Sequence, residues 1–363
     1  MVVRADAALE IGTGHVMRCL TLANSLRENG AKVSFICREH PGNLIDFIKK
    51  KKYEVYILPH TDDVCTNTDK EIISEEELRN IRWLGATQLK DAKECELILK
   101  NIKPDWLVVD HYSIDYLWHN YLRNYTKEIM VIDDLANRRF NCNLLLDQTY
   151  GRQAKDYKSL VPEKCQLLIG SGYALLRSEF AELRNYSVSR RKNPELKRIL
   201  ITLGGVDKDN VTSNILEVIN NCDLPDYCCI TIVMGATAPW INEVREHASS
   251  LKWSTEVLVN VSDMAQLMAD SDLAIGAAGA SSWERCCLGL PSLMVVLASN
   301  QNDIAYNLEN AGCAIRIDVK NIQVLNSIFH ELSIKKLKSL SASSLLVTDG
   351  KGVDNTVKHM LDY

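Results

Sequence analysis

At 363 residues, with 46% hydrophobic and 25% charged residues, the chain has the composition of a folded protein of about two domains. Its 42 Lys and Arg against 47 Asp and Glu give a formal charge of -5, which argues against a nucleic-acid binder that works through a basic groove. No apolar run reaches the roughly 18 residues of a bilayer span, and the start, MVVRADAALEIG, is too charged for a signal peptide. We therefore expect a cytoplasmic protein with no nucleic-acid or membrane partner.

Short apolar runs alternate with helical patterns in the first half of the chain. Val2-Val3 begins the first strand, and a glycine turn leads into a helix over residues 15–30 that stops at Gly30. A strand over 32–39, a helix over 41–51 and a strand over 54–59 follow. This βαβαβ order predicts a parallel sheet with helices on both faces.

The chain turns polar and acidic from His60 to Arg82, which predicts an exposed loop or insert. Three further strands follow, over residues 105–112, 128–136 and 141–151, and each ends in polar residues. Open α/β sheets bind their ligands at the carboxyl ends of parallel strands. The clusters Asp110-His111-Tyr112 and Asp133-Asp134 therefore become candidates for a site.

The second half repeats the architecture without repeating the sequence. Residues 185–197 are charged and poor in apolar side chains, which predicts a linker, and six strands alternate with helices beyond it. We expect an N-terminal domain over 1–184, a C-terminal domain over 198–363 and a cleft between two doubly wound α/β domains. The terminal helix is expected to pack back on the N-terminal domain.

The twelve cysteines do not have the spacing of a metal site. Cys228-Cys229 and Cys286-Cys287 are adjacent pairs, and no C-x-x-C occurs. Cys19, Cys37 and Cys142 lie in apolar runs, where a reduced thiol behaves as a small hydrophobic side chain. We expect structural thiols and no metal site.

The first glycine turn, IGTGHVMR, presents Gly12 and Gly14 before a helix. A dinucleotide site would have a third glycine where this chain has Met17, so the pattern meets the Rossmann fingerprint only in part. His15 follows the glycines at the helix start, where the positive end of the helix disfavours imidazolium. The residues leave two alternatives open: a neutral general base, or a histidine that packs or caps the helix.

The second glycine element is GAAGASSWE, residues 276–284. Gly279, Ser281 and Ser282 place small residues and N–H donors before a helix, which suits phosphate oxygens, and no P-loop lysine is present. Glu284 could reach a ribose diol or could simply answer the helix dipole. Gly204-Gly205 in LGGVD and Asn300-Gln301 after the strand over 292–298 also follow strands.

Seven segments in order resemble the UDP-2,4-diacetamido-2,4,6-trideoxy-β-L-altropyranose hydrolase family of pseudaminic acid biosynthesis. They are RADAALEIGTGHVMRCLTLANSL, VVDHY, IDDLANR, GYALLRSEF, ILITLGGVD, GAAGASSWERCCLGLPS and ASNQ. The resemblance extends to about Ile317 and implies a GT-B fold, similar to the glycosyltransferase that adds N-acetylglucosamine to the peptidoglycan lipid precursor.

The resemblance also implies roles for individual residues. It makes His15 the general base for inverting hydrolysis at the anomeric carbon of the UDP-sugar, without metal or cofactor. It places the sugar and phosphate side of the substrate against Gly12, Gly14, Arg18, Tyr112, Asn300 and Gln301. It assigns the nucleotide to the C-terminal domain, where the candidate UDP contacts are Gly204, Gly205, Gly279, Ser281, Ser282 and Glu284.

Two other functions remain open from the sequence. One is a UDP-sugar glycosyltransferase of the same fold, although no amphipathic membrane helix is evident in the first half. The other is a nucleotide-sugar binding protein without catalysis, which would leave His15 without a role. A serine hydrolase is not indicated, because no G-x-S-x-G motif occurs. We expect a monomer whose small-molecule partner is a UDP-sugar.

Overall fold

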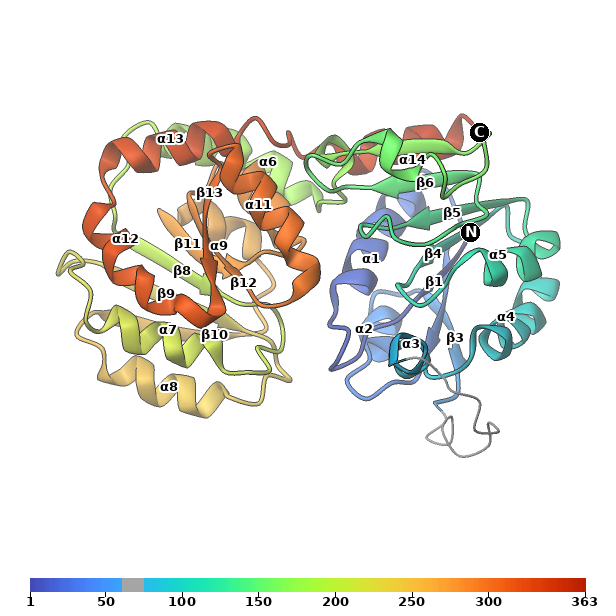
Figure 1. Cartoon of the computed structure of the whole chain (residues 1–363), viewed down its shortest axis with the longest axis horizontal. Coiled ribbons are helices and arrows are strands. Elements are labelled where there is room, and N and C mark those ends of the chain that lie inside the picture. The colour runs from blue at the N-terminus through green and yellow to red at the C-terminus, as the bar shows by residue number, and fades with distance from the viewer. Residues whose placement is uncertain (61–74) are drawn as a thin grey trace. The chain divides into compact units, whose positions relative to one another are not determined.

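Two parallel β-sheets, one in each half of the chain, organise the computed structural model (Figure 1). The structure describes residues 1–60 and 75–363. One unit comprises Met1–Leu175 together with Val353–Tyr363, and the other comprises Leu176–Gly352. Two doubly wound α/β units are therefore present, as the alternating pattern predicted. In the described ranges no helix is both long and apolar enough to cross a bilayer.

The first unit is built on a seven-stranded sheet in the order β3-β2-β1-β4-β5-β6-β7, with every pair parallel. Its strands are β1 Val2–Ala5, β2 Ser34–Arg38, β3 Glu54–Leu58, β4 Trp106–Asp110, β5 Glu128–Ile132, β6 Leu144–Asp147 and β7 Gln166–Ile169. Six of the seven had been predicted as apolar runs. The sequence analysis missed β7, which has only four residues at the edge of the sheet.

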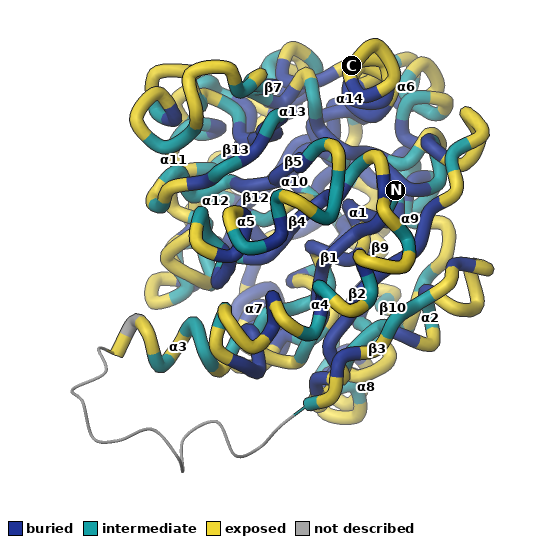
Figure 2. Tube along the Cα trace, turned by 90° about the vertical axis from the view of Figure 1, so that its right-hand side faces the viewer, coloured by how far each residue is buried: buried dark blue, intermediate teal, exposed yellow. Residues whose placement is uncertain are grey.

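Helices cover both faces of this sheet because successive strand residues point to opposite sides. Val3 lies in a core cluster with residues of α1 (Gly14–Glu28) and α2 (Ile45–Lys50). Val2, its neighbour, packs with residues of α4 (Gln88–Ile102) and α5 (Tyr116–Leu122). The strands β1 and β4 are accordingly dark blue in Figure 2.

The predicted exposed loop from His60 to Arg82 needs correction. Residues 75–84 form helix α3 (Glu75–Leu84), and residues 61–74 lie outside the described part of the chain. Three consecutive glutamates open this helix and hide its pattern. Leu78, Ile81 and Leu84 nevertheless follow at helical spacing, which is the signal that could have identified it.

The last helix, α14 (Gly352–Leu361), contributes its apolar face to the first unit. Val353, Val357 and Met360 are buried in the same cluster as Val3 and the α1 side chains. Asn355 donates a hydrogen bond to the carbonyl of Gly172, 3.2 Å away. The first unit is thus completed by residues from both ends of the chain.

The second unit has a six-stranded parallel sheet in the order β10-β9-β8-β11-β12-β13. Its strands are β8 Arg198–Thr202, β9 Cys229–Met234, β10 Ser254–Val259, β11 Leu273–Ala277, β12 Ser292–Val296 and β13 Ala314–Asp318. Its helices are α6 Ser178–Arg190, α7 Val211–Ile219, α8 Ile241–Ser250, α9 Met264–Asp270, α10 Ser281–Cys287, α11 Asn302–Asn310, α12 Leu325–Glu331 and α13 Ile334–Ser344. All six strands match predicted apolar runs.

The predicted linker over residues 185–197 is also corrected. Residues 185–190 belong to α6, which is part of the second unit, so the chain leaves the first unit near Leu175 rather than after residue 184. Arg190 of this segment pairs with Asp272, 2.6 Å away, and donates to the carbonyl of Ser271 at 3.1 Å. Arg191 donates to carbonyls of Met268 and Ser271. The charged side chains that suggested a solvent-exposed linker therefore form hydrogen bonds within the second unit.

Candidate active site

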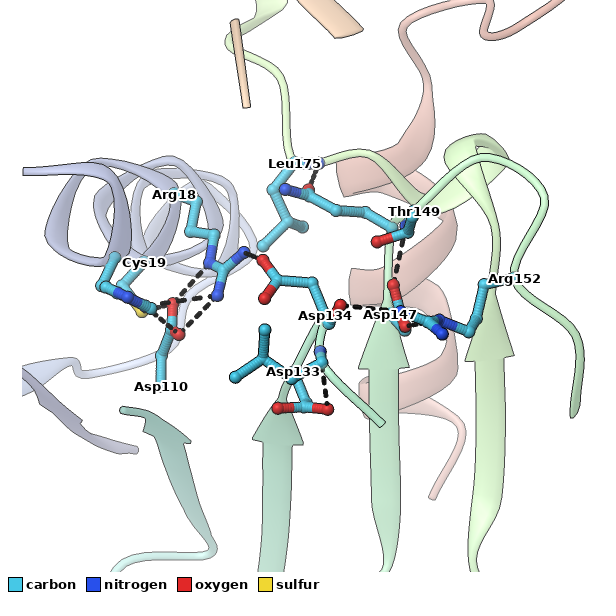
Figure 3. Close-up of polar contacts among 12 residues, drawn as sticks. Arg18, Cys19, Asp110, Asp133, Asp134, Asp147, Thr149, Arg152 and Leu175 are labelled. Atoms are coloured by element: carbon cyan, nitrogen blue, oxygen red, sulfur yellow. Dashed lines mark hydrogen bonds and ion pairs between the residues drawn. The ribbon is translucent and has the colours of Figure 1, made fainter. Parts of the chain in front are cut away.

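Acidic side chains gather at the carboxyl ends of neighbouring strands in the first unit. Asp110 ends β4, Asp133 and Asp134 follow β5, and Asp147 ends β6. Because these strands are parallel and adjacent, the carboxylates lie along one edge of the sheet (Figure 3). Each of the four is bound by an arginine. The predicted ligand edge thus carries a row of charge pairs.

His15 reaches this edge from the start of α1. Gly12, which has φ +75°, turns the chain back through a bridge to Ala8 and lets the helix begin at Gly14. The ring of His15 is 7% exposed, and its Nδ1 lies 2.6 Å from Oδ1 of Asp110. The helix start therefore places the imidazole against the last residue of β4.

Arg18 lies one turn after His15 and holds the same carboxylate. Its Nε is 2.6 Å from Oδ2 of Asp110, its Nη2 is 2.6 Å from Oδ1, and its Nη1 is 2.9 Å from Asp134 (Figure 3). Burial opposes the charge of Asp110, but the guanidinium of Arg18 prevails and holds the pKa of Asp110 well below its usual range. Asp110 is therefore an anion that can accept the proton on His15 Nδ1, which leaves Nε2 as the basic ring nitrogen.

Tyr112 packs on the same imidazole. The two rings meet edge to face with centroids 4.5 Å apart, and Tyr112 is half-buried. Burial, followed by the negative charge of Asp134, raises the pKa of Tyr112 well above its usual value. The phenol thus stays protonated and can donate a hydrogen bond beside His15.

His111 lies between Asp110 and Tyr112 in the sequence, but its side chain contacts Asp6 and Ser113. Its Nε2 lies 3.5 Å from Asp6, and its Nδ1 accepts a hydrogen bond from the backbone N–H of Ser113. Burial lowers the pKa of His111 to about 3, so this ring is neutral. Asp6 also pairs with Arg4, which in turn pairs with Asp91. This network is internal, and we assign it to the framework under the site.

Tyr157 links the next two strand ends, a feature that sequence reasoning missed. Its hydroxyl lies 2.7 Å from Asp133 and 2.8 Å from Asp147. Arg138 and Arg152 hold the same two carboxylates. Each arginine stands five residues after its aspartate, and this repeated spacing is the sequence signal that could have revealed the pairs.

In the second unit, the candidate glycines lie at strand ends as expected. Gly204, with φ +94°, and Gly205 follow β8 and are exposed. A Cβ at Gly235, after β9, would lie 2.1 Å from the carbonyl oxygen of Gly205. The two loops therefore approach at backbone distance, which only glycine permits.

The loop between β11 and α10 brings together the other candidates of this unit. Ser281 and Ser282 open α10, and both hydroxyls accept hydrogen bonds from Arg285 at 3.0 Å. Glu284 is partly buried, and that burial raises the pKa of its carboxyl. Arg285 was not among the predicted residues. Nothing in its sequence position distinguishes it from a solvent-exposed helical arginine.

Asn300 and Gln301 form a short 3-10 turn after β12. The Oε1 atom of Gln301 accepts a hydrogen bond from the backbone N–H of Leu297, 2.9 Å away, whereas Asn300 is exposed. Gln301 therefore shapes the loop on which Asn300 is presented. Within residues 1–60 and 75–363, no three His, Cys, Asp or Glu side chains converge in a way that could hold a metal ion.

Comparison with solved structures identifies the architecture. The MurG of Acinetobacter baumannii matches with a TM-score of 0.71 at 15% identity, covering 100% of this chain and 99% of that one. The two parallel-sheet units thus define an α/β protein of the GT-B fold. Residues 199–346 also match the glycosyltransferase family 28 C-terminal domain.

Two curated proteins match most of this chain by sequence. The UDP-2,4-diacetamido-2,4,6-trideoxy-beta-L-altropyranose hydrolase of Campylobacter jejuni is 26% identical over 309 residues, which cover 85% of this chain and 96% of that protein. The uncharacterized protein MJ1062 of Methanocaldococcus jannaschii is 28% identical over 301 residues. That match covers 82% of this chain and 55% of MJ1062, so the chain spans about half the length of that relative. The chain is therefore a distant relative of a nucleotide-sugar hydrolase.

Proposed function

We propose that this chain hydrolyses UDP-2,4-diacetamido-2,4,6-trideoxy-β-L-altropyranose and releases UDP and the free sugar with inversion at C1. The observation that carries the proposal is the 2.6 Å contact between His15 Nδ1 and Asp110, because it leaves the other ring nitrogen free to accept a proton. The named hydrolase relative, matched along 96% of its length, supports the choice of substrate.

In this reaction a water oxygen forms a bond to C1 as the bond from C1 to the diphosphate oxygen breaks. His15 takes a proton from that water, and the electron pair of the broken bond leaves with UDP. Asp110, held as an anion by Arg18, stabilises the imidazolium that forms. UDP is a good leaving group, so the remaining task is to stabilise the charge of the diphosphate.

The other residues of the first unit then have defined tasks. Gly12 and Gly14 leave room at the turn, since a Cβ at either would meet nothing within 4 Å. Tyr112 is the hydroxyl donor on the sugar side. Arg18, whose three guanidinium nitrogens are bonded to Asp110 and Asp134, positions these carboxylates rather than binding substrate itself.

The second unit supplies the nucleotide site in this proposal. Gly204, Gly205, Gly279 and Ser281 would contact the diphosphate, and Glu284 would bind the ribose hydroxyls. Ser282 was also a predicted contact, but it is buried, its N–H donates to the carbonyl of Gly279 and its hydroxyl to Met294 Sδ, so it supports the turn instead. Asn300 is presented toward solvent on its turn and would contact the sugar or phosphate. No cofactor or metal enters the scheme.

The decisive experiment is turnover in water labelled with ¹⁸O, without any acceptor. Cleavage of the C1–O bond gives UDP without label, whereas attack on phosphorus puts one ¹⁸O into the UDP, and mass spectrometry separates the two. NMR of the first product formed reports the anomeric configuration. Stoichiometric unlabelled UDP with an inverted sugar supports the proposal, and absence of UDP release contradicts it.

A glycosyltransferase of the same fold is the second candidate, and the family 28 match over residues 199–346 favours it. It would release UDP only when an acceptor alcohol is added. A nucleotide-sugar binding protein would retain intact substrate under both conditions. Comparing the reactions without and with an acceptor alcohol therefore distinguishes all three functions.

A further inference from the structure

Arg285 lies beneath the loop that joins β11 to α10 and is 1% exposed. Its Nη2 donates to the carbonyl of Ala277 at 2.8 Å and to Ser282 Oγ at 3.0 Å, and its Nη1 donates to Ser281 Oγ. A Cβ at Gly276 would lie 2.7 Å from Nη1. The guanidinium is therefore packed directly against this loop.

The charge of Arg285 has no ionic partner among the described residues, because all its hydrogen-bond acceptors are neutral oxygens. Its Nε–H is buried and donates to no partner. The buried arginines of the first unit differ, since Arg4, Arg18 and Arg38 each pair with carboxylates. Burial lowers the pKa of Arg285, and the carboxylate of Glu284, which forms no ion pair with it, offsets that effect only in part.

The position of Arg285 makes its buried positive charge still more unfavourable. The side chain folds back over the first residues of α10, where backbone N–H groups already carry partial positive charge. An isolated buried cation is unfavourable unless a negative group compensates it. Arg191 is the contrasting case in the same unit, because its acceptors include three carbonyls near the carboxyl end of α9, besides the carbonyl and hydroxyl of Ser187.

We propose that Arg285 is a positioning residue for a diphosphate, which would supply from outside the loop the negative charge that Arg285 lacks inside it. This inference rests on the proposed nucleotide site. It adds a buried cation that acts through Ser281, Ser282 and the loop backbone, without touching the ligand itself. A neutral nucleoside bound by the same unit would not gain from it.

The test compares three ligands on the full chain: uridine, UDP and inorganic pyrophosphate, each titrated by calorimetry. Arg285→Met removes the charge and the hydrogen bonds, and Arg285→Gln removes the charge but retains hydrogen-bonding capacity. Arg191→Met is the matched control, a second buried arginine of this unit without a carboxylate partner.

We expect both Arg285 variants to bind UDP and pyrophosphate about tenfold to a hundredfold more weakly, with uridine affinity changed by less than about twofold. The free Arg285→Met protein should melt at or above the temperature of the unmodified chain, because an uncompensated buried charge has been removed. Arg191→Met should melt lower and keep the normal ratio of UDP to uridine affinity.

Equal weakening of uridine and UDP, or unchanged UDP affinity, would overturn the inference and leave Arg285 as a structural residue. Failure of both Arg285 variants to fold would overturn it as well, since the inference requires that the free chain not depend on this cation. If the unmodified chain binds UDP but the Arg285 variants do not selectively lose UDP affinity, this inference alone is contradicted. An unmodified chain that binds none of the three ligands contradicts the proposed function too.

Discussion

The carboxylate of Asp110 lies 2.6 Å from the imidazole Nδ1 of His15, and both of its oxygens are also bound by Arg18. The histidine comes from the first turn of α1 and the aspartate from the end of β4. One side chain thus fixes the orientation of the ring and the nitrogen that carries its proton. The effects of replacing His15 and of replacing Asp110 can be measured separately.

Replacing His15 by Leu should lower kcat by about 10²- to 10⁴-fold, because a general base contributes that much to a proton transfer. UDP affinity should remain within about twofold, since the proposed nucleotide contacts lie in the other unit. Steady-state turnover and UDP titration check the two expectations. Near-normal turnover in the variant would remove His15 from the mechanism.

Asp110→Asn should also reduce turnover, by at least about 10²-fold, because the amide can stabilise the wrong tautomer of His15; the corresponding change in a Ser-His-Asp triad costs about 10⁴-fold. Asp134→Asn is the matched control. It removes the other carboxylate bound to Arg18 without touching His15. A loss as large in the control as in Asp110→Asn would mean that Arg18, not the histidine orientation, limits the rate.

Acidification should destabilise the fold through buried neutral histidines. Burial lowers the pKa of His119 to about 3 from an unfolded value near 6.5. The stability that the neutral His119 ring contributes is complete above pH 6.5 and is lost as the pH falls toward 3. In that range the unfolded chain binds a proton at this histidine and the native chain does not. Between pH 7 and pH 5, the free energy of unfolding measured in urea should fall by about 2 kcal/mol less for His119→Gln than for the unmodified chain. The exposed His330→Gln should behave like the unmodified chain.

Tyr157→Phe should lower the free energy of unfolding by about 1–3 kcal/mol, because Asp133 and Asp147 lose the hydroxyl that lies between them. Burial raises the pKa of Asp147, so its proton can replace part of the lost hydrogen bonding at low pH. The deficit should therefore be larger at pH 8 than at pH 5, as measured by urea unfolding. A deficit independent of pH would show that Asp147 does not take up a proton in place of the lost hydrogen bond.

Val357→Ala should cost about 2 kcal/mol, because this α14 side chain is buried in the core of the first unit. Hydrogen exchange followed by mass spectrometry should show faster exchange in residues 1–60 and 75–175 but not in 176–352. The exposed Lys358→Ala on the same helix is the control. Uniform acceleration across both units would contradict the assignment of α14 to the first unit.

Most of the fold was predictable because strands of a parallel sheet are buried on both faces and appear as apolar runs. The same physics explains the errors. The strand β7 lies at the edge of the sheet, and of its four residues only Leu168 is fully buried, so it lacks the buried run that marks most of the other strands. The charges of residues 185–197 resembled a linker because nothing in the local sequence shows that Arg190 and Arg191 bind partners far along the chain.

The positions of the candidate residues in the fold were predictable from the sequence, but their contacts with one another were not. Parallel strands placed Asp110 and Asp134 at one edge, and the glycine turn placed His15 at the helix start. The contact between His15 and Asp110 joins residues 95 positions apart, a pairing that one sequence does not encode locally. His111, by contrast, was grouped with Asp110 and Tyr112 at the strand end but points to Asp6 in the interior.

The placement of α14 has a consequence for how the protein is made. Residues 1–175 leave the ribosome first, but the cluster around Val3 stays open on one side until Val353, Val357 and Met360 have been translated. The second unit contains all of its own elements and can finish folding earlier. The first unit is therefore completed only after the second has been synthesised, and a stop codon between residues 352 and 357 would damage the first unit while leaving the elements of the second intact.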